Sequence, residues 1–424
     1  MGLHCAIKPY LIKTVRHALL DELPQGSSPG SPSLCVVDFM WLLFRFSGAT
    51  GLDLLRFYLR QIFEAYDAGI FRVAVLTDDA LRVPEQKRAE QLRRRKKRPR
   101  ASSATAAAMP ISDHDLPSDF TAALMINEFR DRMMSYLAKG VERLLKGSRY
   151  DDLAKRVIAR RRFPTNTKLV ACLNIGSFPC QTWTWRNGQG WKCSKVSIVL
   201  PYHGEADLAT VDVIRFFVRL DEERGRPTTG VVVRTIDSDS IPILLLLRSQ
   251  LASSISLYLW LPVCGAGAAS GRRSTYTDTC TASPSVVAIA NELIPPGGTF
   301  LPARSVGKDA TRSNLWNYEN KLLFRVDTMY NDEDLARFVV LCVIMGTDFN
   351  AKLVPRASAV TISQALSRRD IALIRKCFRS AEPLATVCNT IFGSDVTTKV
   401  PMKEFVNASW TLRYWSGLIG CSGG

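Results

Sequence analysis

Two short apolar segments on either side of an amphipathic helix constrain the fold of this chain most strongly. Residues 34–37 are a run of Leu, Cys and Val, and residues 71–77 form a second apolar run. Between them, residues 52–68 place their apolar side chains on one helical stripe. A strand, a helix and a strand in this order predict a parallel arrangement. We therefore expect an α/β fold with a mostly parallel central sheet flanked by helices.

The remaining sequence extends this pattern. In the segment around residues 183–191, Asn187-Gly188 predicts a tight hairpin turn, and we expect its three Trp residues to pack on the core rather than to stack bases. The uncharged stretch 249–271 predicts a core strand and a loop rather than a membrane span, because Pro262 interrupts its short apolar part. Further strands are expected at 196–200 and 230–236, and helices at 122–162, 205–220 and 332–345.

The charge balance narrows the partners. The 424 residues carry 56 Lys and Arg against 39 Asp and Glu, a formal net charge of +17. Such a balance suits a polyanion such as nucleic acid, although dispersed charge on a soluble protein explains it equally well. Seven of the eight residues 93–100 are basic, which is typical of a nuclear import signal or of a segment that contacts phosphates.

Cysteine usage and the N-terminus bear on the compartment. The chain has 11 Cys and 4 His, and its sequence contains no Cys-x-x-Cys pair, so a zinc finger has little support. The odd cysteine count fits a reducing compartment, and the N-terminus lacks the apolar core of a secretory signal. With the basic run, these features predict a nuclear protein, otherwise a cytoplasmic one, and not a secreted one.

Carboxylates repeatedly follow the ends of the apolar elements. An Asp after a strand is usually a loop residue or a helix cap, so each example alone is a weak signal. In an open parallel sheet, however, functional groups gather at the carboxyl ends of the strands. The order and spacing of the whole set therefore predict one acidic cluster, formed by Asp38, Asp78, Asp79, Glu205, Asp207, Asp237, Asp239 and Asp348.

Such a cluster predicts bound divalent cations. Converging carboxylates repel each other and are costly to desolvate. Mg²⁺ prefers oxygen ligands and suits phosphate chemistry. Two ions roughly 4 Å apart can stabilise both the attacking water and the leaving oxygen of an in-line displacement. We therefore expect two Mg²⁺ ions, with Mn²⁺ as a substitute.

Several sequence blocks resemble the flap-endonuclease superfamily of 5′-nucleases. The most specific are Glu205-Ala206-Asp207 and Asp237-Ser238-Asp239, which resemble the family's Glu-Ala-Asp and Asp-x-Asp blocks. The resemblance covers residues 1–100 and 196–366. Its blocks occur in the family's order, at residues 1–10, 36–42, 75–84, 201–209, 235–239 and 344–349.

The resemblance implies a PIN-like fold with a basic helical arch. It implies a two-metal site held by Asp38, Asp79, Glu205, Asp207, Asp237, Asp239 and Asp348. It also implies that Lys87, Arg88 and Arg93 orient the scissile phosphate. Further nucleic-acid contacts would come from Gly2, Arg94 and Arg95.

The sequence departs from the family pattern in four places, one of which is that the first arch lysine falls on Gln86, with Lys87 beside it. The second acidic site reads Asp78-Asp79, and counting back from Pro84 favours Asp79. Residues 353–359 contain no Gly, where the family has a Gly-x-Gly hairpin that binds duplex backbone with a K⁺ ion. No C-terminal motif resembles the family's sliding-clamp peptide, so the sequence does not support a clamp partner.

These features predict four regions. Residues 1–100 would form an N-terminal nuclease region, and residues 101–195 an arch-like and β-rich insertion. Residues 196–350 would form an internal nuclease region with a loop insertion at 271–314. Residues 351–424 would form a divergent helical C-terminal region.

The expected activity is Mg²⁺-dependent, structure-specific hydrolysis of phosphodiester bonds in DNA, of the 5′-flap or 5′→3′ exonuclease type. Two alternatives stay open. One is an RNA endonuclease of the viral host-shutoff type, which shares this fold. The other is a scaffold of the same fold that binds nucleic acid but no longer cleaves it. DNA is favoured over RNA as the partner, and no membrane partner is expected.

Overall fold

The structure is a computed structural model. It describes residues 33–43, 46, 48–67, 69–79, 85, 88, 111–124, 126–161, 163, 166–194, 205–225, 228–235, 240–248, 250–252, 254–261, 322–325, 332–347, 349–354, 357, 359–393 and 396–419.

The described strands form one eight-stranded mixed sheet in the order β5-β4-β3-β2-β1-β6-β7-β8. Five neighbouring strands run parallel, in the order β3, β2, β1, β6 and β7. Antiparallel pairings join β4 and β5 to one side and β8 to the other. The strands are β1 (Leu34–Asp38), β2 (Arg72–Leu76), β3 (Leu169–Asn174), β4 (Gln181–Arg186), β5 (Gly190–Ser194), β6 (Gly230–Arg234), β7 (Ser256–Leu261) and β8 (Leu322–Arg325).

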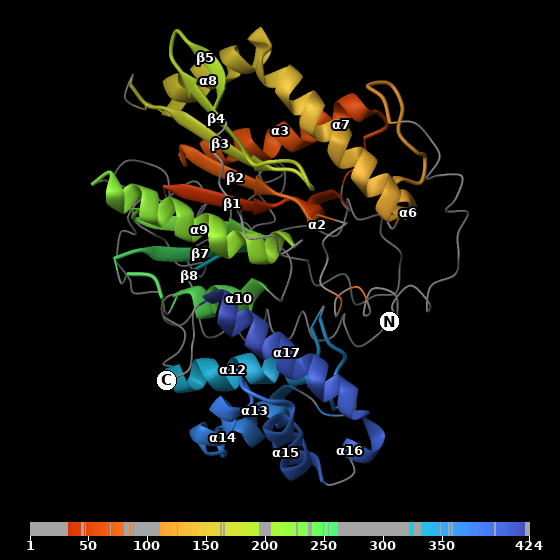
Figure 1. Ribbon diagram of the computed structural model, residues 1–424. Coiled ribbons are helices and arrows are strands. Elements are labelled where there is room, and N and C mark those ends of the chain that lie inside the picture. Colours follow the sequence, from red (N-terminus) through yellow and green to blue (C-terminus); the bar gives the residue numbers. More distant parts are fainter. Residues whose placement is uncertain are drawn as a thin grey trace, which may run out of the picture.

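Helices cover both faces of this sheet, as Figure 1 shows. One face packs against α3 (Gly51–Asp67), α6 (Phe120–Ala123), α7 (Asn127–Leu145) and α8 (Ser148–Arg161). The other face packs against α9 (Ala206–Glu223) and α10 (Ser240–Arg248), and the core on that side continues into the C-terminal helices. These are α12 (Asp332–Met345), α13 (Ala359–Ser367), α14 (Ile371–Lys376), α15 (Ala381–Phe392), α16 (Val396–Lys399) and α17 (Met402–Ile419); the short α2 (Met40–Leu43) follows β1.

The two helical layers explain why β1 is a continuous apolar run. Successive strand residues point to opposite faces of a sheet. Leu34 and Val36 pack into the α9 side of the core, and Cys35 and Val37 pack into the α3 side. Because both faces are covered, no position in the run is left for a polar side chain. The α/β prediction is therefore confirmed, as a mixed sheet flanked by helices.

Local sequence signals explain several element boundaries. Helix α3 begins after Thr50, whose N–H donates to Asp53 Oδ2 (3.2 Å) while the Asp53 N–H donates back to Thr50 Oγ1 (3.1 Å). This reciprocal pair satisfies N–H groups that a helix start leaves open. Helix α12 has the bounds expected from the sequence, 332–345, whereas the strand expected at 196–200 lies outside the described residues.

The Trp-rich segment forms the β4–β5 hairpin. Gly188 has φ +75° in its turn, a conformation that favours glycine. Trp183, Trp185 and Trp191 are buried, which confirms their packing role. Because β3 pairs in parallel with β2, this β-rich part of the 101–195 segment continues the central sheet. None of the described helices is long and apolar enough to cross a membrane.

Candidate functional site

The carboxyl ends of the parallel strands define the candidate site. From β1, the chain passes to β2 on one side, whereas β6 and then β7 lie on the other side. The strand order therefore reverses between β1 and β6. Open α/β sheets bind ligands in the crevice at such a switch point. Among the described acidic residues expected from the sequence, Asp38 ends β1, and Asp78 and Asp79 follow β2.

Asp38 joins the ends of the two central strands. It is the last residue of β1 and is 5% exposed. Its Oδ1 accepts the Met40 N–H (3.0 Å), which orders the start of α2. Its Oδ2 accepts the hydroxyl of Thr235, the residue after β6 (3.1 Å). This carboxylate is thus held at the switch point by both of its oxygens.

The adjacent residues Asp78 and Asp79 follow β2 and differ in environment. Asp78 Oδ1 accepts the N–H of Ala206, the first residue of α9 (3.0 Å). This bond brings the start of α9 to the end of β2 and satisfies one of its open N–H groups. Asp79 is buried, with 6% exposure. Asp78 therefore acts at the helix N-terminus, which leaves Asp79 as the stronger candidate ligand.

Glu205 and Asp207 are brought to the same edge by the start of α9. Both are buried, at 2% and 7% exposure. Glu205 occupies the N-cap position but makes no capping hydrogen bond with its side chain. The Glu205 side chain therefore does not cap α9. The positive end of the helix dipole favours negative charge at both residues.

The end of β2 is supported from β3. The Thr77 N–H donates to the Asn174 carbonyl (3.0 Å), and the Gly176 N–H donates to Thr77 Oγ1 (2.6 Å). Gly176 has φ +55°, and a Cβ there would lie 3.0 Å from Met134 Cβ of α7. The loop after β3 is thus wedged between Thr77 and α7. It holds the backbone immediately before Asp78 and Asp79.

The loop after α12 is organised by a buried polar network. The Thr347 hydroxyl donates to Asn350 Oδ1 (2.8 Å), and the Asn350 amide donates to the Val343 carbonyl (2.9 Å). Gly346 has φ +93°, and a Cβ there would meet the Lys352 backbone nitrogen at 2.8 Å. Phe349 is buried and contacts the rings of Trp410, Tyr414 and Trp415 on α17. Asp348 itself lies outside the described residues, as do Asp237 and Asp239.

The basic segment has both of its described ends at this acidic edge. Between Asp79 and Ile111, the structure describes only residues 85 and 88. The Gly51 N–H donates to the Ser112 carbonyl (3.0 Å), and the Leu52 N–H donates to the Asp113 carbonyl (3.3 Å). Because α3 follows β1, its start lies at the carboxyl edge. The segment is therefore anchored beside the acidic residues at both ends.

Asp113 strengthens the second anchor. Its carboxylate accepts the Tyr136 hydroxyl (2.7 Å) and pairs with Arg143 (2.7 Å) on α7. The hydrogen bond from Arg143, followed by that from Tyr136, lowers the pKa of Asp113 below its ordinary value. Burial, followed by the hydrogen bond to Asp113, raises the pKa of Tyr136.

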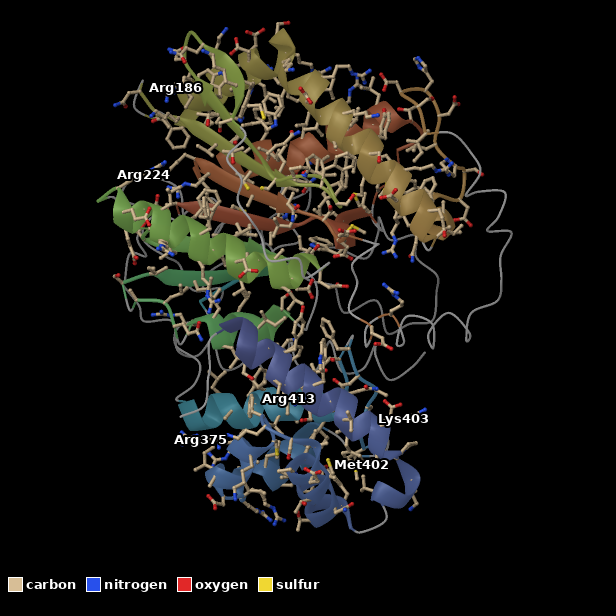
Figure 2. All side chains as sticks on the ribbon, viewed as in Figure 1. Arg186, Arg224, Arg375, Met402, Lys403 and Arg413 are labelled. Carbon is tan, nitrogen blue, oxygen red and sulfur yellow. The ribbon has the colours of Figure 1, made fainter. Side chains whose placement is uncertain are left out.

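Of the basic residues expected to contact nucleic acid, the structure describes Arg88, which is exposed. Gly2, Lys87, Arg93, Arg94 and Arg95 lie outside the described residues. Other exposed positive charges are spread over the surface. Arg186 and Arg224 lie near the sheet, whereas Arg375 and Arg413 lie on the helical C-terminal region (Figure 2). A single basic face is therefore not evident among the described residues.

An ion pair lies at the amino ends of the parallel strands, opposite the acidic residues. Arg72, at the start of β2, pairs with Asp221 near the end of α9 (2.8 Å), and both side chains are largely buried. The Arg72 guanidinium also lies 5.2 Å from the ring centre of Phe217. Sequence reasoning missed this pair because its members are 149 residues apart. A charged residue opening an apolar strand was the one local signal.

Comparison with protein-family models, curated proteins and solved structures finds no match for this chain.

Four of the seven carboxylates predicted as metal ligands lie within the described residues. Asp38, Asp79, Glu205 and Asp207 are all buried and supply only oxygen ligands, as Mg²⁺ requires. Among the residues that the structure describes, no group of three or more His, Cys, Asp or Glu side chains is close enough to hold a metal ion. The other three predicted ligands, Asp237, Asp239 and Asp348, lie outside the described residues.

Proposed function

We propose that this protein is a Mg²⁺-dependent nuclease with a PIN-like fold, a divergent relative of the flap endonucleases. It would hydrolyse phosphodiester bonds in structured DNA, in the manner of a 5′-flap or 5′→3′ exonuclease. Two hydrogen bonds support the proposal, because they hold acidic segments at the carboxyl ends of the central strands. Asp38 is bonded to the end of β6, and Asp78, next to Asp79, is bonded to the helix start that carries Glu205.

The proposed roles follow from the position of each group. Two Mg²⁺ ions, with Mn²⁺ as a substitute, would be held by Asp38, Asp79, Glu205, Asp207, Asp237, Asp239 and Asp348. When bound, the ions would lower the pKa of the attacking water and neutralise charge that develops on the phosphate. The hydrogen bonds on Asp38 keep its carboxylate in place, and Thr77 does the same for the backbone before Asp79. Fixed ligands of this kind spare the reaction a reorganisation step.

The basic segment would supply most of the affinity for nucleic acid. Its two described ends flank the acidic edge, so Lys87, Arg88 and Arg93 can orient the scissile phosphate near the metals. Arg94 and Arg95 would contact backbone phosphates, and Gly2 would lie near the strand. Phosphate contacts of this type are independent of sequence. With the basic run as an import signal, we place this activity in the nucleus.

The decisive experiment compares two identical substitutions on the same helix. Glu205→Gln removes one buried ligand at the start of α9, whereas Glu222→Gln changes an exposed residue near its end. Single-turnover cleavage would be measured on flap, hairpin and single-stranded DNA and RNA, with Mg²⁺ and with EDTA. We expect Glu205→Gln to slow cleavage by about a thousandfold or more, because ligand loss removes several kcal/mol of transition-state stabilisation. Glu222→Gln should cleave like the wild type.

The remaining outcomes separate the alternatives. Cleavage of RNA without cleavage of DNA would favour the endonuclease of the host-shutoff type. If the wild type binds nucleic acid but cuts none of these substrates in Mg²⁺ or Mn²⁺, the protein is a binding scaffold. Equal cleavage by Glu205→Gln and Glu222→Gln would show that the metal assignment is wrong. Binding measured in EDTA should differ between the variants by no more than a few-fold.

A further inference from the structure

Two buried thiols lie next to each other beside the candidate site. Cys172 lies in β3 and Cys180 lies just before β4, and their sulfur atoms are 3.0 Å apart. Cys172 is fully buried and Cys180 is 9% exposed. A disulfide bond is about 2.05 Å long, so the two sulfurs are only about 1 Å from bonding distance. The two cysteines are eight positions apart in the chain.

The loop that these thiols bracket supports the acidic edge. It contains Asn174 and Gly176. The Asn174 carbonyl accepts the Thr77 N–H, and the Gly176 N–H donates to Thr77 Oγ1. Thr77 directly precedes Asp78 and Asp79. A covalent bond across the base of the loop would restrict the backbone of residues 173–179. The thiol pair can therefore act on the end of β2 without contacting it.

We propose that Cys172 and Cys180 form a reversible disulfide that stiffens the β3–β4 loop and, through Thr77, the backbone that carries Asp78 and Asp79. In reducing compartments, disulfides of this kind are usually transient and redox-sensing rather than structural. The bond itself stands independently of the proposed nuclease activity. An effect of the disulfide on cleavage would rest on that activity.

A small disulfide such as glutathione disulfide serves as the oxidant. The thiolate of Cys180, the more exposed residue, attacks one sulfur of the reagent, forms a mixed disulfide and releases one glutathione thiolate. The Cys172 thiolate then attacks the Cys180 sulfur and releases the second. The two electrons and the two thiol protons end on two molecules of glutathione. The hydrogen bond with Cys180 and burial raise the pKa of Cys172, so this second step should be slow at neutral pH.

Thiol trapping tests the bond. The protein would be equilibrated in mixtures of reduced and oxidised glutathione, quenched with acid, unfolded and alkylated. Oxidation of the wild type should protect two thiols and join the peptides that contain Cys172 and Cys180 in the mass spectrum. Cys180→Ser and Cys180→Ala should show no such protection. Cys193→Ser, which changes an exposed cysteine on β5, should behave like the wild type.

Stability and amide exchange test the coupling. Oxidation should raise the Tm of the wild type by roughly 2–5 °C and slow exchange of the Thr77 and Gly176 amides. Neither change should occur in Cys180→Ser or Cys180→Ala. Alkylation of both thiols at every glutathione ratio, or pairing of either with another cysteine, would overturn the disulfide. A disulfide that forms without slowing exchange at Thr77 and Gly176 would overturn the coupling. Because both readouts are independent of cleavage, an inactive wild type would count against the proposed function alone.

Discussion

At the scale of single residues, neighbouring carboxylates at the carboxyl edge have different partners. Asp78 accepts a backbone N–H from Ala206, so it helps to start α9. Asp79, one position further, is buried. Asp78 thus has a structural role, whereas Asp79 has a proposed role as a metal ligand. Mutation of the two residues should distinguish these roles.

We predict that Asp78→Ala lowers the free energy of unfolding by about 1 kcal/mol, because an N–H at the helix start loses its acceptor. Asp79→Asn should change stability less, since it keeps the shape of the side chain. It should, however, weaken the stabilisation that added Mg²⁺ gives by binding the folded state. Urea unfolding with and without Mg²⁺ checks both effects. Full Mg²⁺ stabilisation in Asp79→Asn would contradict the ligand role.

At the scale of elements, helix α17 supports the loop after α12. Phe349 packs against three of its aromatic residues. We predict that Phe349→Leu lowers the free energy of unfolding by about 1–2 kcal/mol and also weakens Mg²⁺ binding, because the loop carrying Asp348 loses its support. Phe405→Leu, in the buried face of α17, is the matched control. It should lose similar stability and keep its Mg²⁺ affinity, which calorimetric titration would measure.

The anchor between the 111–116 loop and α7 should respond to acid. The pKa of Asp113 is lowered in the folded state by Arg143 and then by Tyr136. A lowered pKa means that this carboxylate stabilises the fold above its ordinary pKa of about 3.8 and loses the effect as pH falls towards the folded value. We predict that the wild type loses stability more steeply than Asp113→Asn below about pH 4.5. Thermal unfolding between pH 3 and 7 measures the difference, and parallel curves would contradict it.

At the scale of the whole molecule, the net charge of +17 should make nucleic-acid binding salt-dependent. Each neutralised phosphate of a duplex contributes about −0.9 to the slope of log affinity against log salt concentration. We predict that replacing Arg93, Arg94 and Arg95 by Ala flattens this slope. Replacing Arg375, Lys376 and Arg379, which are exposed on the helical C-terminal region, removes the same charge and should change the slope little. Equal slopes for the two triple variants would place the basic run off the binding path.

Local pattern determined several elements of this protein, although the helical run expected at 122–162 is divided among α6, α7 and α8. The apolar runs at residues 34–37 and 71–77 and the helix at 332–345 were predictable, because periodicity and capping act within a few residues. The same reasoning predicted that the Trp-rich hairpin packs on the core. It also predicted that Asp38 lies at the end of β1 and that Asp78 and Asp79 follow β2. The assignment of those carboxylates to two metals stays a prediction, since Asp237, Asp239 and Asp348 lie outside the described residues.

Tertiary structure decided which distant residues meet. The bond between Asp78 and Ala206 spans 128 positions, the pair of Arg72 and Asp221 spans 149, and the bond between Asp38 and Thr235 spans 197. No local periodicity encodes such contacts, because they depend on strand order and on how the helices pack against the sheet. The closeness of Cys172 and Cys180 likewise required the register of β3 and β4. The sequence by itself determined helices, strands and the chemistry of their side chains. Tertiary packing determined which of these side chains lie next to one another.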